Sequence, residues 1–390
     1  MVNGVGLSVR RITRWLPVAV LAGGCYTPTD PADRMHPQSV VLMATPKFIS
    51  DFDHPQADIA RFLENYRPLT SRASETIVIF SVGNSDHILE YRGTGSWNDK
   101  IEWARTTDFV PVFDAELDYH QVALIVAAFR NAAVAAGIRL KIYDQIDSGS
   151  EFTLVNNFKY VHHPECTANQ WGMFDIRGRL SADKRAFASA PDGIPEGTTC
   201  GEFLADQVAA YTRDLGFDGM MFDNQLGTRG RWHDGDGVGF SVEESLAIQN
   251  FLEYSKRVLQ PRELMWFDSY NNIQVERETF SFPLGGYKSF DYLIASGFCV
   301  TVKTRPYSDN LASKLSLSGG PKILATLDYV DPWYSYNSMT DYAGCSQQLE
   351  QTAVDFRFEI DGLMFFANDD DGSLIPTGMI KSFADRYWGR

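Results

Sequence analysis

Four aspartates each follow a short apolar run of the kind that forms a buried strand: Asp144, Asp223, Asp268 and Asp328. A single one would more often cap the next helix than take part in catalysis. Four carboxylates gathered at one rim would repel one another, which raises the pKa of some of them and suits acid–base chemistry. A pair of such groups, one proton donor and one base or nucleophile, is what glycoside hydrolysis requires.

Asp223 is the predicted nucleophile or base of this pair, and Asp268 is the predicted acid. The two aspartates would end neighbouring strands, so they could lie close together. The other carboxylates considered for the acid are Asp144, Glu276 and Asp328. A separation of about 5 Å between the two carboxyl groups would indicate retention of stereochemistry, and roughly 6.5–9.5 Å would indicate inversion.

The elements that would position these residues are short apolar runs that alternate with helical patterns. Each run is apolar nearly throughout, as expected for a parallel strand buried on both faces. The predicted strands are 39–45, 76–82, 139–144, 218–223, 263–268, 291–296, 322–328 and 361–367. The clearest predicted helices are 58–66, 119–136, 202–215, 242–259, 309–317, 347–354 and 379–387, with a weak one at 273–279. This order predicts a single (β/α)8 TIM barrel. An open doubly wound sheet is the alternative, but its glycine-rich nucleotide loop is missing after the first strand.

Turns and loops add to this prediction. Gly137, Gly216 and Gly362 stand near helix exits or strand entries, where a left-handed residue would help the chain turn. Two long segments, 83–119 and 145–201, follow the second and third strands. Both would leave from the carboxyl ends of strands, which is the catalytic face of a barrel, so we expect them to shape a substrate cleft.

Polar and aromatic residues near the strand ends complete the predicted site. Polar side chains there point into the site of a barrel, and aromatic rings can stack on sugars, although packing within loops is their alternative role. The predicted substrate-binding residues are Asp144, Asn84, Gln225, Asp328, Trp97, Trp103, Tyr270, Asn271 and Trp333. No metal and no cofactor is predicted, because the rim offers carboxylates but few histidines. Two turns rich in Gly and Asp, 233–237 and 368–372, lack the twelve-residue calcium loop, so plain turns are favoured there.

The segment 216–227, GFDGMMFDNQLG, resembles the fourth-strand signature of barrel glycosidases. In family 66 dextranases a similar stretch, F-D-G-x-x-x-D followed closely by L-G, carries the aspartate nucleophile, and Asp223 matches that position. The acid of that family is a Glu that closes the sixth strand. Ser296 stands there in this chain, so the acid does not carry over.

The same segment is similar to the D-G-x-D-x-D-x-E motif of family 18 chitinases and to the N-x-E version in family 85 endoglycosidases. In that alignment Asp223 is the penultimate carboxylate and Gln225 takes the place of the acid Glu. Glutamine cannot donate a proton as a general acid. Residues 266–269, WFDS, resemble the W-Y-D-S of the family 85 fifth strand. The resemblance covers the fourth and fifth strands and implies a barrel that acts on sugars.

Three functions follow from these patterns. The first is a glycoside hydrolase that acts on a poly- or oligosaccharide. The second is a non-catalytic glycan-binding protein, because Gln225 and Ser296 replace the acids of the related families. The third is a lyase or aldolase-type barrel enzyme, which usually needs a lysine or a metal at the rim. It ranks last, because Lys141 lies inside the third predicted strand and no strand ends in lysine.

The amino-terminal segment has the layout of an export signal. Arginines precede a short apolar stretch at 15–22, and two glycines and Cys25 follow it. The stretch is too short to span a bilayer. It resembles a bacterial lipoprotein signal, which implies a lipid anchor at Cys25 and a cell-envelope location, in the periplasm or at the outer membrane. An ordinary signal for secretion is the alternative. The predicted organisation is therefore a signal peptide at 1–25, a tether at 26–37 and a barrel at 38–390.

Composition limits the partners of the folded body. The 50 acidic and 35 basic residues of the whole chain give a net charge of −15, which disfavours nucleic acids and anionic lipid surfaces as partners. A hydrophobic fraction of 44% is ample for a packed core. Without Cys25 four cysteines are left, and the predicted disulfides are Cys166–Cys200 and Cys299–Cys345, with buried thiols as the alternative. The oligomeric state stays open.

Overall fold

The computed structural model describes part of the chain in nine ranges. These are residues 38–80, 119–146, 198–222, 242–268, 284–295, 307–317, 319–329, 342–368 and 372–389. The predicted signal peptide and tether lie outside them, and so does most of the two long segments at 83–119 and 145–201.

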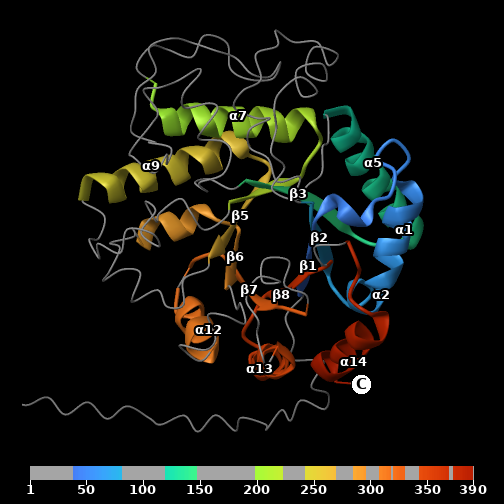
Figure 1. Ribbon diagram of the computed structural model, residues 1–390. Helices are drawn as coiled ribbons and strands as arrows, with labels where there is room; N and C mark the ends of the chain where they lie inside the picture. The colour runs from blue at the N-terminus through green and yellow to red at the C-terminus, as the bar shows by residue number, and fades with distance from the viewer. Residues whose placement is uncertain are drawn as a thin grey trace, which may run out of the picture.

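The described strands form a closed barrel of eight parallel strands in chain order. Figure 1 looks into this ring, with the helices on the outside. The strands are β1 Ser39–Ala44, β2 Glu75–Phe80, β3 Leu140–Ile146, β4 Gly219–Phe222, β5 Glu263–Asp268, β6 Tyr292–Ala295, β7 Lys322–Leu327 and β8 Gly362–Phe366. Because β1 pairs with β2 on one side and with β8 on the other, the sheet has no free edge. The structure confirms the TIM barrel and excludes the open doubly wound sheet.

Helices surround this barrel. They are α1 Gln56–Asn65, α2 Arg67–Thr70, α5 Tyr119–Ala136, α7 Cys200–Asp214, α9 Val242–Leu259, α12 Tyr307–Leu315, α13 Tyr342–Asp355 and α14 Thr377–Trp388, with short 3-10 helices at η2 Pro46–Phe48 and η5 Leu284–Ser289. A capping box starts α7: Thr199 Oγ1 accepts from the Glu202 N–H at 3.1 Å, and Glu202 accepts from the Thr199 N–H at 3.0 Å. The weak helix predicted at 273–279 lies outside the described residues. None of the described helices is long and apolar enough to cross a membrane.

The predicted disulfides are untested by this structure. Cys166 and Cys299 lie outside the described residues, and Cys200 and Cys345 are described through their backbones, in α7 and α13. The pairing of the four cysteines stays a prediction.

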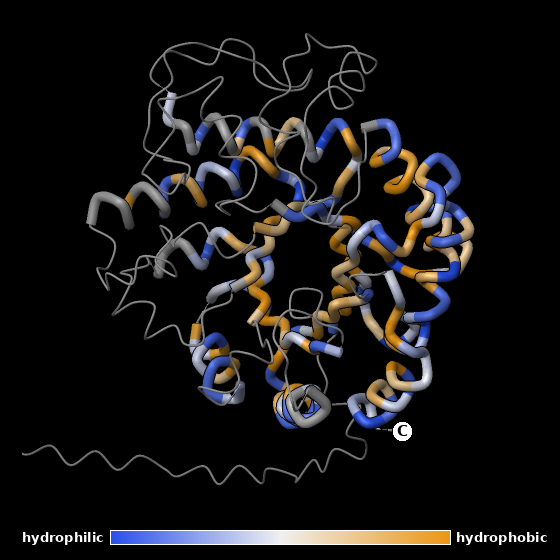
Figure 2. Tube along the Cα trace, in the orientation of Figure 1, coloured by the Kyte–Doolittle hydropathy of each residue, from blue (hydrophilic) through white to orange (hydrophobic). Residues whose placement is uncertain are grey.

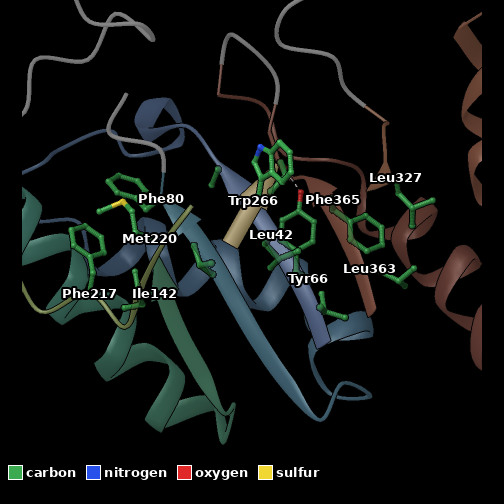
Figure 3. Close-up of a cluster of buried hydrophobic side chains, with 14 of the residues drawn as sticks. Leu42, Tyr66, Phe80, Ile142, Phe217, Met220, Trp266, Leu327, Leu363 and Phe365 are labelled. Atoms are coloured by element: carbon green, nitrogen blue, oxygen red, sulfur yellow. Dashed lines mark hydrogen bonds between the residues drawn. The ribbon is translucent and has the colours of Figure 1, made fainter. Parts of the chain in front are cut away.

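Side chains alternate between two cores along every strand, as the two-residue period of a strand requires. One core contains side chains of strands only, so it fills the interior of the barrel. Its members are Val41, Met43, Ile77, Ile79, Tyr143, Met221, Met265, Phe267, Tyr292, Ile294, Leu324, Met364 and Phe366. The other core combines the alternate strand residues with helix residues and lies between the barrel and its helices. Figure 3 shows part of this second core around Leu42, Tyr66 and Phe365, and in Figure 2 the hydrophobic strands contrast with the more polar helices.

Three aspartates fasten the amino-terminal ends of neighbouring strands. Each stands directly before an even-numbered strand, and its Oδ2 accepts a backbone N–H of the preceding strand. The pairs are Asp218 with Ile142 at 2.9 Å, Asp291 with Leu264 at 2.8 Å and Asp361 with Ile323 at 2.8 Å. Asp218 is the first aspartate of the motif that resembles glycosidase signatures, and in this fold it fixes the register of β3 against β4.

The three predicted turn glycines divide into two kinds. Gly137 and Gly216 have positive φ angles of 68° and 80°, so the prediction of left-handed residues is confirmed for them. Gly362 is not left-handed, and the prediction was wrong there. It begins β8 at a point of close approach, where an added Cβ would lie 2.1 Å from the carbonyl oxygen of Ser39 on β1. The missing side chain lets the two strands that close the barrel come together.

Candidate functional site

The predicted site lies at the carboxyl-terminal ends of the strands, and the structure describes part of it. Asp144 and Asp328 are described with their side chains, and Asp268 through its backbone. The other predicted site residues lie outside the described residues: Asp223, Asn84, Gln225, Trp97, Trp103, Tyr270, Asn271 and Trp333. Glu276 and Ser296 also lie outside them.

Asp328 follows the last residue of β7 and faces the barrel. Its neighbours Leu327 and Tyr329 both pack in the core between the barrel and the helices. The alternation of side chains therefore places Asp328 on the barrel-facing side. It is 1% exposed, and its carbonyl oxygen accepts a hydrogen bond of 2.7 Å from the Ser346 hydroxyl of α13.

Tyr329 anchors the backbone next to Asp328 to the helix layer. Its hydroxyl donates to Glu350 of α13, and the other carboxylate oxygen of Glu350 accepts from Arg386 of α14. The ring stacks on Phe365 of β8, with 6.1 Å between centroids and 7° between planes. Burial, with the adjacent Glu350 carboxylate, raises the pKa of Tyr329 well above its ordinary value, so the hydroxyl stays a proton donor at physiological pH.

Tyr307 of α12 bridges β6 and β7 two residues before Asp328. Its hydroxyl donates to the carbonyl oxygen of Ala295 at 2.8 Å and accepts from the N–H of Thr326 at 2.7 Å. The Thr326 hydroxyl donates to the same carbonyl at 2.8 Å. Side-chain hydroxyls therefore join the two strands at this point, and they hold the segment that leads to Asp328.

Asn368 after β8 is a rim residue outside the predicted substrate-binding set. Ala367 packs against the helices, so Asn368 faces the barrel. Its amide nitrogen donates to Thr45 Oγ1 at 2.6 Å, and its amide oxygen accepts from the Thr45 N–H at 2.9 Å. Both residues are buried, and the pair fastens β1 to β8 at the carboxyl-terminal rim.

Asp144 stands on the opposite register from Asp328, on the helix-facing side of its strand. It pairs with Met220 of β4 and lies on the same face of β3 as Ile142, and both of these residues pack against the helices. Asp268, described through its backbone, ends β5 and pairs with Ala295 of β6. The Asp144 carboxylate accepts from the N–H of Gln145 at 2.8 Å and is 1% exposed. The expectation that a polar strand end points into the site is therefore not met at Asp144, because β3 continues to Ile146 and Tyr143, not Asp144, faces the barrel interior. A role of Asp144 in substrate binding stays a prediction.

Lys141 lies at the other end of the barrel, among two carboxylates. Its Nζ is 2.8 Å from Glu75 Oε2 and 2.7 Å from Glu263 Oε2. Burial opposes the charge of this lysine, but the hydrogen bonds with Glu263 and Glu75 outweigh burial and raise the pKa of Lys141. A protonated lysine at the amino-terminal face cannot serve as the nucleophilic amine of an aldolase at the rim.

Metal ligands are not grouped in the part of the chain that the structure describes. No set of three or more His, Cys, Asp and Glu side chains there could hold an ion. Of the turn at 368–372, the two end residues are described and 369–371 lie outside the described residues. The prediction of a metal-free site is untested.

Comparisons with known proteins give a likeness of fold. No protein-family model and no curated protein matches the chain. A plant class V chitinase mutant from Cycas revoluta in complex with (GlcNAc)3 is similar, with a TM-score of 0.49 and 11% identity, over 90% of this chain and 99% of that one. The α-galactosidase TtGalA from Thermus thermophilus in complex with stachyose has a TM-score of 0.45 and 11% identity, over 90% of this chain and 65% of that one.

A putative deoxyribose-phosphate aldolase from Toxoplasma gondii is also similar, with a TM-score of 0.36 and 10% identity, over 91% of this chain and 93% of that one. Of the α-galactosidase, this chain spans about two thirds, or 65% of the length of that protein. Likenesses this distant carry no argument about activity. The assignment of the fold comes from the closed eight-stranded barrel.

Proposed function

We propose that this protein is a glycoside hydrolase that cleaves a poly- or oligosaccharide with two carboxylates at the carboxyl-terminal face of its barrel. The observation that supports this most directly is Asp328, a buried carboxylate on the barrel-facing register at that face. Enzymes with this fold carry their catalytic groups at this end. Sugar-active barrels need such carboxylates and use no metal or cofactor in the common mechanism.

Asp223 is the proposed nucleophile or base. It directly follows Phe222, the last residue of β4, which packs against the helices, whereas Met221 faces the barrel interior. Continued alternation predicts a barrel-facing side chain at Asp223. Asp268, the acid that the sequence predicted, ends the neighbouring strand β5. Proton donation by Asp268 stays a prediction.

We also propose which residues bind the substrate and where the protein is located. Asn84, Gln225 and the aromatic residues of the rim are proposed to bind sugar rings. The export signal with Cys25 supports a lipoprotein of the cell envelope, or a secreted protein if the signal is of the ordinary kind.

A non-catalytic glycan-binding protein is the second candidate. Gln225 and Ser296 support it, because they replace the acids of the families that the fourth strand resembles. This candidate predicts that the protein binds glycans and never cleaves them.

The release of reducing ends separates the two functions. The purified protein is incubated with a panel of polysaccharides and aryl glycosides, and Asp223→Asn is assayed beside it. We expect turnover of at least one substrate by the wild type and a loss of at least about 100-fold in D223N. Glycan binding without any release would support the second candidate. Full activity of D223N on every cleaved substrate would show that Asp223 is not catalytic.

A further inference from the structure

We infer that Asp328 is the proton-donating carboxylate of this site and that Tyr329 is the residue that positions it. The inference rests on the proposed glycoside hydrolase activity and replaces the partner that the sequence suggested. It starts from the register of the strands: among the residues whose side chains the structure describes, Asp328 is the only carboxylate that is barrel-facing at the carboxyl-terminal ends.

The backbone register differs between Asp328 and Asp268. On β5, Met265 and Phe267 fill the barrel interior, and Asp268 is the next residue of the strand after Phe267. At β7, Leu327 and Tyr329 belong to the helix-facing series, which leaves Asp328 facing the barrel. A group that reaches the substrate must face the barrel mouth, where the carboxyl ends of all the strands converge.

Three helices hold the backbone around Asp328 from behind. Ser346 of α13 donates to its carbonyl oxygen, and Tyr307 of α12 holds Thr326, two residues earlier. On the other side Tyr329 reaches Glu350, which Arg386 of α14 also contacts. Such support is what a catalytic group needs, since a displacement of about 1 Å can cost about 100-fold in rate.

The chemistry assigned to Asp328 is proton transfer to the leaving group. In its acid form it gives its proton to the glycosidic oxygen while the bond from that oxygen to the anomeric carbon breaks. Water adds to the anomeric carbon and yields its proton to the second carboxylate. Each turnover consumes one water and leaves both groups ready after proton exchange with solvent.

Substitution of the two aspartates tests the assignment of the donor. On a substrate that the wild type cleaves, Asp328→Asn is expected to lower kcat by at least about 100-fold while Tm changes little. The fall in kcat caused by Asp268→Asn is expected to be at least about tenfold smaller than the fall caused by D328N. If D268N loses more activity than D328N, or if D328N keeps most of its activity, the assignment is overturned. Absence of turnover in the wild type across the panel would instead defeat the proposed function itself.

Tyr329 has a matched control in Tyr254. The Tyr254 hydroxyl of α9 also donates to a buried carboxylate, Asp206 of α7, at 3.0 and 3.1 Å, but neither residue lies at a strand end. Tyr329→Phe and Tyr254→Phe each remove one hydroxyl from the same kind of pair. A similar fall in Tm is therefore expected for both variants.

Kinetics then separate positioning from a purely structural role. We expect Y329F to lower kcat on the order of tenfold with KM unchanged, because the donor is displaced while sugar binding is kept. Y254F is expected to keep both constants. Equal kcat values in Y329F and Y254F would overturn the positioning role of Tyr329, whatever the result for D328N.

Discussion

Glu75 lies at the amino-terminal end of β2, inside a ring of polar groups. It accepts hydrogen bonds from the Ser39 hydroxyl at 3.0 Å and from the Tyr292 hydroxyl, and it pairs with Lys141. Burial disfavours its charge, but the bonds from Lys141 and Tyr292 outweigh burial and lower its pKa to about 2. The carboxylate therefore stabilises the folded protein only while it is ionised.

The pH dependence of stability should show this contribution. A carboxylate with a lowered folded pKa stabilises the fold above its unfolded pKa, and this is lost as the pH falls through its folded pKa. We expect the Tm difference between the wild type and Glu75→Gln to be largest above about pH 5 and to vanish toward about pH 2. Glu64→Gln, at an exposed residue of α1, is the control, with a small difference at every pH. A Tm difference between the wild type and Glu75→Gln that stays the same at every pH would contradict the prediction.

Single residues of the site were only partly predictable from the sequence. The apolar runs predicted Asp144, Asp268 and Asp328 at strand ends. Asp268 ends β5 and Asp328 directly follows β7, as expected, whereas β3 continues past Asp144 to Ile146. Which face each one occupies depends on the phase of alternation inside the strand, and a run that is apolar on both faces hides this phase. The anchoring of Asp328 by Ser346 and Tyr329 involves distant packing, which no local pattern reveals.

Strands and helices were more predictable than their contacts. The helices at 119–136 and 242–259 have the predicted bounds, because long periodic patterns fix the type of an element well. The predicted helix 58–66 is followed by a second short helix at Arg67–Thr70, which Pro68 can join because proline is tolerated in a first helical turn. The role of Asp218, Asp291 and Asp361 across strand pairs was not foreseen, since each bond joins segments far apart in the sequence.

One of these strand clamps makes a direct test at the scale of elements. Asp361→Ala leaves the Ile323 N–H without its 2.8 Å side-chain acceptor. We therefore expect the free energy of unfolding, measured by urea denaturation, to be about 1–3 kcal/mol lower than in the wild type. Asp361→Asn keeps an acceptor oxygen at the same place, so its free energy of unfolding should fall by less than half as much as that of Asp361→Ala. Equal losses in the two variants would mean that the hydrogen bond to β7 is not what stabilises this strand pair.

The whole barrel sets the distance between the proposed catalytic groups. β4 and β7 are three strands apart in the closed ring, and neighbouring strands lie about 4.8 Å apart, so their ends are separated by roughly 14 Å along the wall. If Asp223 and Asp328 are the pair and both reach inward, we expect a carboxyl separation closer to the roughly 6.5–9.5 Å of an inverting pair than to the 5 Å or so of a retaining pair.

Stereochemistry therefore provides a test at the scale of the molecule. We expect the first product released by the wild type to have the anomeric configuration opposite to that of the cleaved bond. Proton NMR of the anomeric signals in the first minutes of the reaction measures this before mutarotation equilibrates the sugar. Retention would contradict the pairing of Asp223 with Asp328 and would favour two carboxylates on closer strands.

The direction of β1 has a consequence for how the protein would sit in a cell. The strand begins at Ser39 at the amino-terminal face, beside Glu75, while the proposed site lies at the other face. A chain anchored in a lipid layer at Cys25 would thus enter the barrel at its amino-terminal face. The lipid anchor would then join the barrel on the face opposite the proposed sugar site, so that the tether would not cross the site.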